Sequence, residues 1–366
     1  MYGNFSALPF VNLTQGVLPV SHIIKLRPFD DMHCHFRTGD LLREVLPFTA
    51  LYCARAIAMP NIRPRAILEG KDVDWYRTQI DYALLGISPK PLLQPLMTIE
   101  IRDATTPKMV ADAFRCGAVA GKVYPLGVTN NSDKGLKSFS HSRIRETFAA
   151  MEELGMLLLL HGELDFPRLL VTKREEQFLF TLDWMVGSFP RLKIVLEHIS
   201  TKKSVEAIRV LRSRGKQVAA TITAHHLCLT LNDVIGDGIR PHNMCMPVAK
   251  DFPDLEALLA AATGGEAGFF LGSDSAPHLR ESKECGHGAC GCFTAPILPC
   301  LLADIFEKNG KLEMLENFTS CFGAKFYGLP LNEGTITLAK EDWIIPAQCG
   351  SVVSFMAGKT LPWKLV

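Results

Sequence analysis

The sequence lacks an excess of charge of either sign. Its 39 lysine and arginine residues are balanced by 38 aspartate and glutamate residues, which gives a formal net charge of +1. A protein that binds nucleic acid or an anionic membrane surface usually carries a marked positive excess. The balance therefore argues against both kinds of partner and favours a small-molecule substrate.

The sequence also has little that would direct it to a membrane or to secretion. No stretch approaches the ~18–20 consecutive apolar residues of a membrane span. No Lys or Arg precedes Lys25, although a signal peptide would begin with basic residues. The 11 cysteines are dispersed, and several, such as Cys53 and Cys300, sit in apolar segments as buried reduced thiols do. We therefore expect a cytoplasmic protein. An organelle address stays open, because acidic residues are also absent before Asp30.

Short apolar segments alternate with longer amphipathic ones along the chain. The apolar segments are rich in Val, Ile and Leu, as strands buried on both faces should be. The predicted strands are 30–36, 55–60, 92–99, 117–124, 156–161, 192–198, 217–223 and 268–274. Among the helices predicted between them are 143–154, 175–186 and 203–214. Gly155 and Gly215 follow two of these helices, where C-cap glycines belong.

This alternation of predicted strands and helices favours a (β/α)8 TIM barrel of the α/β class. The 366 residues fit one barrel, which takes ~250 residues plus insertions. We expect a single domain over residues 1–366, with the barrel core at about 26–330 and short peripheral strands from the two terminal segments. The alternative is an open doubly wound sheet, although no G-x-G-x-x-G motif follows an early strand.

Residues of the types that bind metals stand at or near the ends of several predicted strands. His33 and His35 lie two apart on the first strand, so their side chains point to the same side. The others are Lys122, His161, His198 and Asp274. A single His after an apolar run is usually structural. The C-terminal ends of barrel strands converge on one rim, however, so this recurrence predicts a metal site there.

The sequence motifs around these residues resemble those of the amidohydrolase superfamily and, within it, the single-domain bacterial-type dihydroorotases. The motifs are DDMHCHFR (30–37), AMPN (58–61), KVYP (122–125), LHGE (160–163), EHISTK (197–202), GSDSAPH (272–278) and GCFTAP (291–296). The match runs in order from about Leu26 to Trp363. It implies a homodimeric cyclic-amide hydrolase that interconverts N-carbamoyl-L-aspartate and (S)-dihydroorotate in pyrimidine biosynthesis.

The resemblance also implies two divalent metal ions, held by His33, His35, Lys122, His161, His198 and Asp274. Lys122 would be N6-carboxylated and bridge both ions; the alternative is that it makes a surface or core ion pair. Imidazole and carboxylate suit zinc, while Mn, Co and Fe remain open. Water between the ions would have its pKa lowered toward about 7, giving hydroxide to attack the ring amide. Asp274 would carry the proton to the leaving nitrogen.

Substrate contacts follow from the same resemblance: Arg37, Asn61, Thr129, Asn130, Met246, His278 and Cys290. A guanidinium can hold the ring carboxylate by two parallel hydrogen bonds. Alternatively, Arg37 makes a salt bridge at the rim, Asn61 is a turn residue and His278 supports neighbours only. The loop 126–135 would close over the substrate. The family often has two adjacent Thr there, whereas this chain has Thr129 and Asn130.

Two other groups of residues invite metal-binding interpretations. Cys285, His287, Cys290 and Cys292 are close in sequence, but a structural zinc would need a completing pair of ligands. We favour a loop lining the active site. His225 and His226 end the seventh strand, where the family has no ligand, so we favour support or packing roles.

Two other functions remain to be separated. A hydantoinase- or dihydropyrimidinase-like enzyme would act on rings that lack the carboxylate, so it would not need Arg37. A non-catalytic scaffold on the same barrel would have lost metal ligands, and none is missing from this sequence.

Overall fold

The computed structural model describes residues 22–130 and 132–366. Eight parallel strands form one sheet in chain order. They are β2 (Phe29–Cys34), β3 (Cys53–Ala58), β4 (Gln94–Ile101), β5 (Ala118–Val123), β6 (Leu157–His161), β7 (Ile194–Glu197), β8 (Val218–Ile222) and β9 (Phe269–Leu271). The first and last segments meet, since Asp274 N donates to His33 O at 2.9 Å and His35 N to Ser275 O at 3.1 Å. The predicted (β/α)8 barrel is confirmed.

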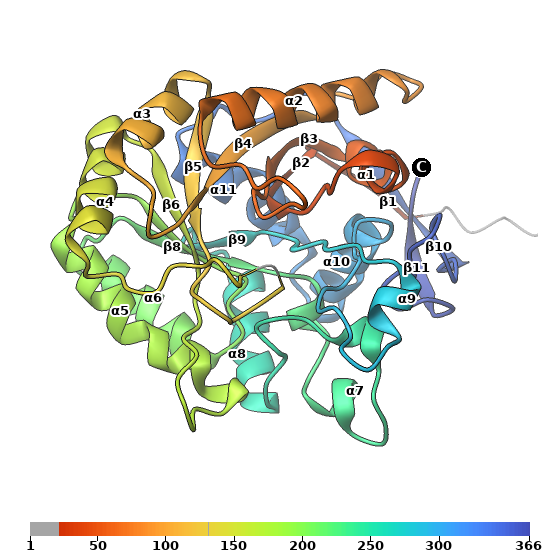
Figure 1. Ribbon diagram of the computed structural model, residues 1–366. Coiled ribbons are helices and arrows are strands. Elements are labelled where there is room, and N and C mark those ends of the chain that lie inside the picture. Colours follow the sequence, from red (N-terminus) through yellow and green to blue (C-terminus); the bar gives the residue numbers. More distant parts are fainter. Residues whose placement is uncertain (1–21, 131) are drawn as a thin grey trace, which may run out of the picture.

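Helices surround the strands on the outside (Figure 1). The longer ones are α1 (Gly39–Ala50), α2 (Gly70–Leu85), α3 (Pro107–Arg115), α4 (Ser142–Leu154), α5 (Arg174–Ser188), α6 (Lys202–Ser213), α8 (Phe252–Thr263), α10 (Leu298–Lys308) and α11 (Phe322–Tyr327). Short helical pieces are η1 (Val171–Lys173), η2 (His225–Leu227), α7 (Asn232–Ile235), η3 (Pro241–Asn243), α9 (Arg280–Lys283), η4 (Leu312–Met314) and η5 (Asn317–Cys321). Within the described part of the chain, no helix has the length and apolar character needed to cross a membrane.

The local predictions agree with this architecture in most details. The predicted helices 143–154, 175–186 and 203–214 correspond to α4, α5 and α6. Gly155 and Gly215 have φ values of 71° and 74°, the left-handed conformation that a C-cap glycine supplies. The last predicted strand was too long, because β9 ends at Leu271 and the chain turns before Asp274, whose φ is 44°.

An apolar layer fills the barrel interior below the C-terminal rim. It consists of Met32, Ile57, Met59, Leu96, Ala120, Leu157, Leu159, Val195, Ala219 and Phe270. Helix α11 packs against this layer. At Gly323 on α11, an added Cβ would lie only 2.9 Å from the Met32 side chain, so the close approach requires glycine. The interior is therefore solid core, and polar groups can gather only above it.

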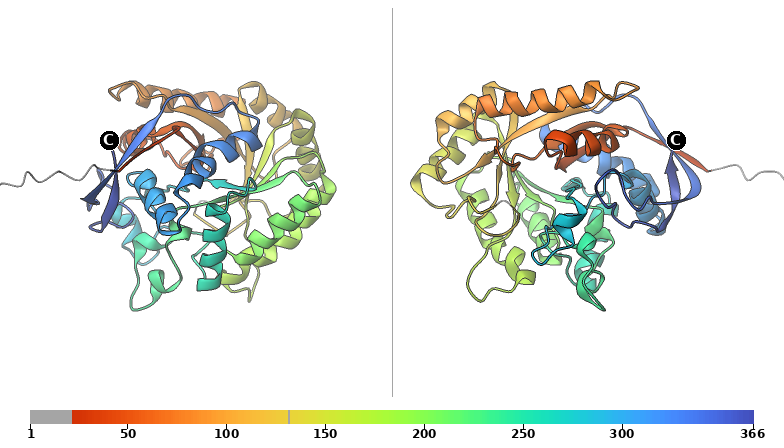
Figure 2. Two further views of the ribbon diagram at one scale, coloured as in Figure 1. Left: turned by 180° about the vertical axis from the view of Figure 1, so that it is seen from behind. Right: turned by 45° about the vertical axis from the view of Figure 1, so that its right-hand side comes forward.

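The terminal segments form a separate three-stranded sheet of β1 (Ile23–Leu26), β10 (Ile336–Ile344) and β11 (Thr360–Leu365). The pairings are antiparallel, and Figure 2 shows this sheet at one side of the barrel. Trp363 of β11 is fully buried and donates from Nε1 to Glu307 of α10 at 3.0 Å. The predicted peripheral strands are confirmed within the described residues; the part of that prediction on residues 1–21 lies outside them.

A buried ion pair joins the first two barrel strands. Arg55 of β3 donates to both carboxylate oxygens of Asp30 of β2, each at 2.7 Å. Asn332 donates to the same carboxylate at 2.8 Å. Both charged side chains are almost fully buried. The stability of each buried charge therefore depends on its partner, because both side chains have little contact with water.

We expect Arg55→Met to lower the free energy of unfolding by about 3–5 kcal/mol, because it leaves the Asp30 charge buried without its partner. The control is Arg43→Met, which removes only an exposed pair with Asp40 and should change stability by less than about 1 kcal/mol. Urea unfolding followed by circular dichroism measures both. Equal stability of the two variants would contradict the role given to this pair.

Candidate metal centre and active site

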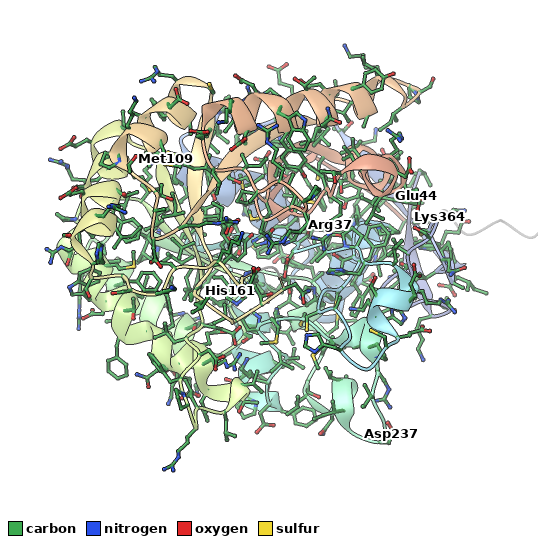
Figure 3. All side chains as sticks on the ribbon, in the orientation of Figure 1. Arg37, Glu44, Met109, His161, Asp237 and Lys364 are labelled. Carbon is green, nitrogen blue, oxygen red and sulfur yellow. The ribbon has the colours of Figure 1, made fainter. Side chains whose placement is uncertain are left out.

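A small cavity opens at the C-terminal end of the barrel. Twelve of the thirteen predicted site residues line it, and the thirteenth, Lys122, lies fully buried on β5. Figure 3 shows the labelled His161 and Arg37 near the centre of the view, inside the ring of helices. The structure thus brings together residues that are up to 245 positions apart in the chain, from His33 to His278.

Two imidazoles and one carboxylate converge on one side of the cavity. His33 lies near the C-terminal end of β2 and His35 directly follows that strand; their Nε2 atoms are 3.3 Å apart. Asp274 Oδ1, from the turn after β9, is 3.3 Å from His33 Nε2 and 3.1 Å from His35 Nε2. These three ligand atoms surround a common point, as the ligands of one metal ion would.

Two further imidazoles continue this cluster. His161 ends β6 and His198 follows β7, and their ring centroids are 4.7 Å apart. The centroid of His198 is also 5.0 Å from that of His33. His161 Nε2 is 2.8 Å from a carboxylate oxygen of Glu163. The four histidines therefore form one contiguous group from three strands.

Lys122 makes a buried ion pair below this group. Its Nζ contacts Glu197 of β7, and the other oxygen of Glu197 is 3.1 Å from His33 Nδ1. Burial lowers the pKa of Lys122 well below its usual value. The unmodified side chain therefore makes the core ion pair that was the alternative to a metal-bridging role, at a position directly beside the histidines.

The donor set fits divalent cations. Burial lowers the pKa of all four histidines, that of His35 to about 3, so the imidazoles are neutral and their lone pairs are available. Among the described residues, His198 Nδ1, His35 Nδ1 and Glu163 Oε1 are buried without hydrogen-bond partners. A buried unsatisfied polar group costs about 1–3 kcal/mol. Neutral imidazoles and a carboxylate that converge on one point are what a metal site offers.

Asp31, which the sequence interpretation did not single out, connects the two strands that carry this cluster. It is fully buried, and its carboxylate accepts from Ser273 N at 2.8 Å, Ser273 Oγ at 2.5 Å and His33 N at 3.2 Å. Asp274 and His198 both adopt positive φ values of 44°. Non-glycine residues hold such a backbone only when their surroundings impose it. For Asp274, the bonds of Asp31 supply that constraint.

Three more residues were missed: Glu163, Glu197 and Tyr124. Each stood inside a quoted motif, next to or near a predicted ligand, but had no role assigned. Tyr124 lines the cavity, and the ammonium group of Lys122 lies 5.0 Å from its ring centroid. The only available signal was a carboxylate or phenol close to a ligand in sequence, which does not by itself show where the side chain points.

Arg37 lines the cavity beside His278. Its Nε donates to Pro277 O at 2.9 Å and its Nη2 is 3.0 Å from His278 Nε2. Within residues 22–130 and 132–366, it forms no ion pair with a carboxylate, so the alternative of a rim salt bridge is not seen there. Asn61 lines the same cavity. A guanidinium without a carboxylate partner beside a cavity is suited to an anionic ligand.

Asn130, after β5, is hydrogen-bonded to Cys290. Asn130 Nδ2 donates to Cys290 O at 2.5 Å, and Cys290 N to Asn130 Oδ1 at 3.4 Å. Thr129 and Met246 also line the cavity. The asparagine that replaces the second threonine thus holds two loops together while its side chain borders the same space.

The zinc interpretation of the sequence-adjacent Cys285–Cys292 group does not match the geometry. Cys285 and His287 are exposed and line a wider outer cleft, as the loop interpretation expected. Cys292 is buried and instead lies beside His225 and Cys245. His226 is held by Thr223 Oγ1 and Pro247 O, both at 2.9 Å from its ring nitrogens, in line with a support role.

Comparisons with known proteins agree with one another. The chain is 42% identical over 353 residues to a dihydroorotase of Shewanella woodyi, which covers 94% of the chain and 99% of the relative. A dihydroorotase structure from Campylobacter jejuni matches with a TM-score of 0.85 at 35% identity, over 94% of the chain and 98% of its own. A dihydroorotase of Saccharomyces cerevisiae in complex with 5-fluoroorotic acid matches with a TM-score of 0.85 at 32% identity, with the same coverage of both chains. No protein-family model matches the chain.

We expect Asp31→Ala to weaken the binding of a divalent cation at this cluster by about 10–100-fold, the usual effect of removing a group that orients metal ligands. The physical reason is that both His33 and the Ser273–Asp274 turn lose a common acceptor. Competition with a chelator measures the affinity. Asp40→Ala, at an exposed carboxylate on α1, is the control. Unchanged affinity in the Asp31 variant would show that the turn holds its shape without it.

Proposed function

The chain belongs to the dihydroorotase family, and we propose that it catalyses the reversible ring closure of N-carbamoyl-L-aspartate to (S)-dihydroorotate. The observation that carries the proposal is one cavity with two kinds of group. A histidine–carboxylate cluster lines it, and so does the guanidinium of Arg37, which forms no ion pair with a carboxylate among the described residues. We further propose that the enzyme is a single-domain homodimer of the cytoplasm, as the family resemblance implies.

The cluster is proposed to hold two divalent ions, with zinc as the first candidate. His33, His35 and Asp274 would bind one ion, and His161 and His198 the other. When bound, the ions supply a water of lowered pKa and polarise the substrate carbonyl. Glu197 Oε1 lies 3.1 Å from His33 Nδ1, on the side of the ring away from the proposed ligand atom Nε2, where carboxylates commonly support metal-binding histidines.

Lys122 is proposed to be N6-carboxylated and to bridge the two ions. The addition of carbon dioxide needs a neutral amine, and burial lowers the pKa of Lys122 in the direction that provides it. Carboxylation would also replace a cationic group next to the proposed ions by an anionic one. The ion pair with Glu197 describes the amine before this modification.

Asp274 is proposed to move the proton. Its Oδ1 lies within 3.3 Å of both His33 and His35, and its side chain borders the cavity. In ring opening, Asp274 takes a proton from the attacking water and delivers it to the ring nitrogen as the amide bond breaks. In ring closure, the same carboxylate removes the proton from the ureido nitrogen as that nitrogen attacks the carboxyl carbon, and delivers the proton to the carboxyl oxygen, which leaves as water when its C–O bond breaks.

Arg37, Asn61 and His278 are proposed to bind the ring carboxylate. Burial, with repulsion from Arg37 and Lys283, lowers the pKa of His278 to about 2, so its neutral Nε2 accepts from Arg37 and orients the guanidinium. Thr129, Asn130 and the backbones of Met246 and Cys290 border the remaining space. The yeast relative holds 5-fluoroorotic acid, a ring carboxylate, which supports this assignment.

We expect Arg37→Met to lower kcat/KM for dihydroorotate by on the order of 100-fold or more, since each hydrogen bond to a charged group contributes about 1.5–3 kcal/mol. Arg43→Met on the outside of α1 is the matched control. Steady-state assays with dihydroorotate and with a hydantoin, which lacks the carboxylate, separate the two candidate substrate classes. Full activity of the variant on dihydroorotate would contradict the proposal.

For Lys122, the expected signature is a carbamate carbon. Wild-type protein equilibrated with ¹³C-bicarbonate should show a bound carbamate signal by ¹³C NMR, and Lys122→Arg should not show it. The arginine cannot be carboxylated but keeps a positive charge, so its metal content should also fall. An active wild-type enzyme without any labelled carbamate would overturn the bridging role.

A further inference from the structure

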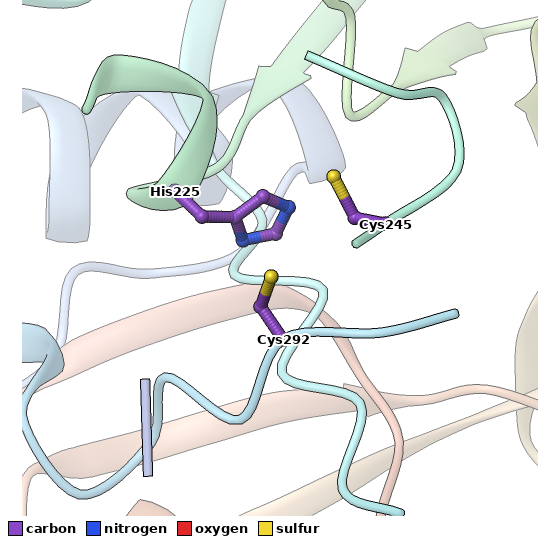
Figure 4. A group of neighbouring side chains, drawn as sticks. All are labelled: His225, Cys245 and Cys292. Carbon is purple, nitrogen blue, oxygen red and sulfur yellow. The ribbon is translucent and has the colours of Figure 1, made fainter. Parts of the chain in front are cut away.

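A second cluster of metal-binding side chains lies outside the proposed active site. It consists of His225 in η2, Cys245 in the loop after η3 and Cys292 in the segment after α9. All three are buried, with exposures of 0, 1 and 0%. Their candidate ligand atoms all lie within 4.8 Å of one another. Figure 4 shows the imidazole of His225 with the two thiols beside it, each from a different segment.

The imidazole of His225 is left unsatisfied at this position. In the part of the chain that the structure describes, neither its Nδ1 nor its Nε2 has a hydrogen-bond partner, although both atoms are buried. A buried polar group without a partner costs about 1–3 kcal/mol. Its neighbour His226, by contrast, uses both ring nitrogens. The orphaned nitrogens of His225 therefore indicate a missing ligand rather than ordinary packing.

The donor types narrow the class of that ligand. Two cysteine sulfurs and one imidazole nitrogen favour a borderline-soft or soft cation such as zinc or Cu(I), whereas Mg²⁺ and Ca²⁺ prefer oxygen. The cluster shares no residue with the six proposed active-site ligands, and it has sulfur where they have none. Lys283 lies close to this segment, with Nζ donating to Gly291 O at 2.5 Å.

We propose that His225, Cys245 and Cys292 bind a thiophilic metal ion of the zinc class, at a site separate from the proposed catalytic pair. The site goes beyond the proposed function, because its ligands do not depend on which reaction the cavity performs. Thiolate binding releases the thiol protons, so the ion would bind more weakly as the pH falls.

The position of the ligands indicates what the ion would do. Cys245 directly precedes Met246, and Cys292 directly follows Gly291; both Met246 and Gly291 line the active-site cavity. The two segments already touch, since Gly291 N donates to Met244 O at 2.8 Å. An ion bound by both cysteines and by His225 would connect this wall of the cavity to the segment that follows β8.

Cobalt substitution tests the proposal in the full-length protein. Metal-free, reduced wild type titrated with Co²⁺ should develop a thiolate-to-cobalt charge-transfer absorption in the near ultraviolet that saturates at one ion per chain. The proposed active-site ligands contain no sulfur, so they cannot produce this band. Cys245→Ser and Cys292→Ser should each lose most of the band. Cys300→Ser, which removes a buried thiol of α10, should keep it.

A second variant and an oxidation test complete the experiment. His225→Gln leaves both thiols in place, so it should retain a charge-transfer band but bind Co²⁺ at least 10-fold more weakly. Absence of the band in wild type whose other cobalt sites are filled would overturn the proposal. So would mass-spectrometric detection of a Cys245–Cys292 disulfide in protein isolated without oxidant, since the sulfurs would then be used otherwise.

Discussion

The meeting of the first and last barrel strands is the constraint on which the candidate site depends. Asp31 binds the Ser273 backbone and side chain while it also accepts from His33 N. Asp274 N in turn donates to His33 O. These bonds close the barrel at the point where the H-x-H pair and Asp274 must face each other. The same hydrogen bonds therefore close the barrel and bring the H-x-H pair next to Asp274.

The solid interior beneath the rim determines where buried polar groups can lie. Because apolar side chains fill the barrel below, the buried polar groups are confined to one level, where each must find a partner. Lys122 and Glu197 pair with each other there, and the histidines are held neutral by burial. The same burial that disfavours charge on the imidazoles and the lysine amine leaves their lone pairs available for metals and carbon dioxide.

Much of this could be predicted from the sequence, because it follows from periodicity and strand ends. The barrel and the helices α4–α6 with their glycine caps follow from periodicity, and the convergence of the metal-ligand candidates follows from the rule that parallel strands end on one rim. The substrate contacts came from the family resemblance. Glu197, Asp31 and the His225–Cys245–Cys292 cluster could not be predicted. Their partners come from distant segments, and the turn after Leu271 and the fold of the 244–292 segments decide which cysteine meets which histidine.

The central proposal is that four imidazoles, Asp274 and an N6-carboxylated Lys122 bind two cations. Diffraction from crystals of the natively prepared protein, measured on both sides of the zinc absorption edge, tests this most directly. We expect two anomalous peaks, one beside His33, His35 and Asp274 and one beside His161 and His198, with added density on Lys122 Nζ between them. An active protein that shows neither peak nor modification there would contradict it.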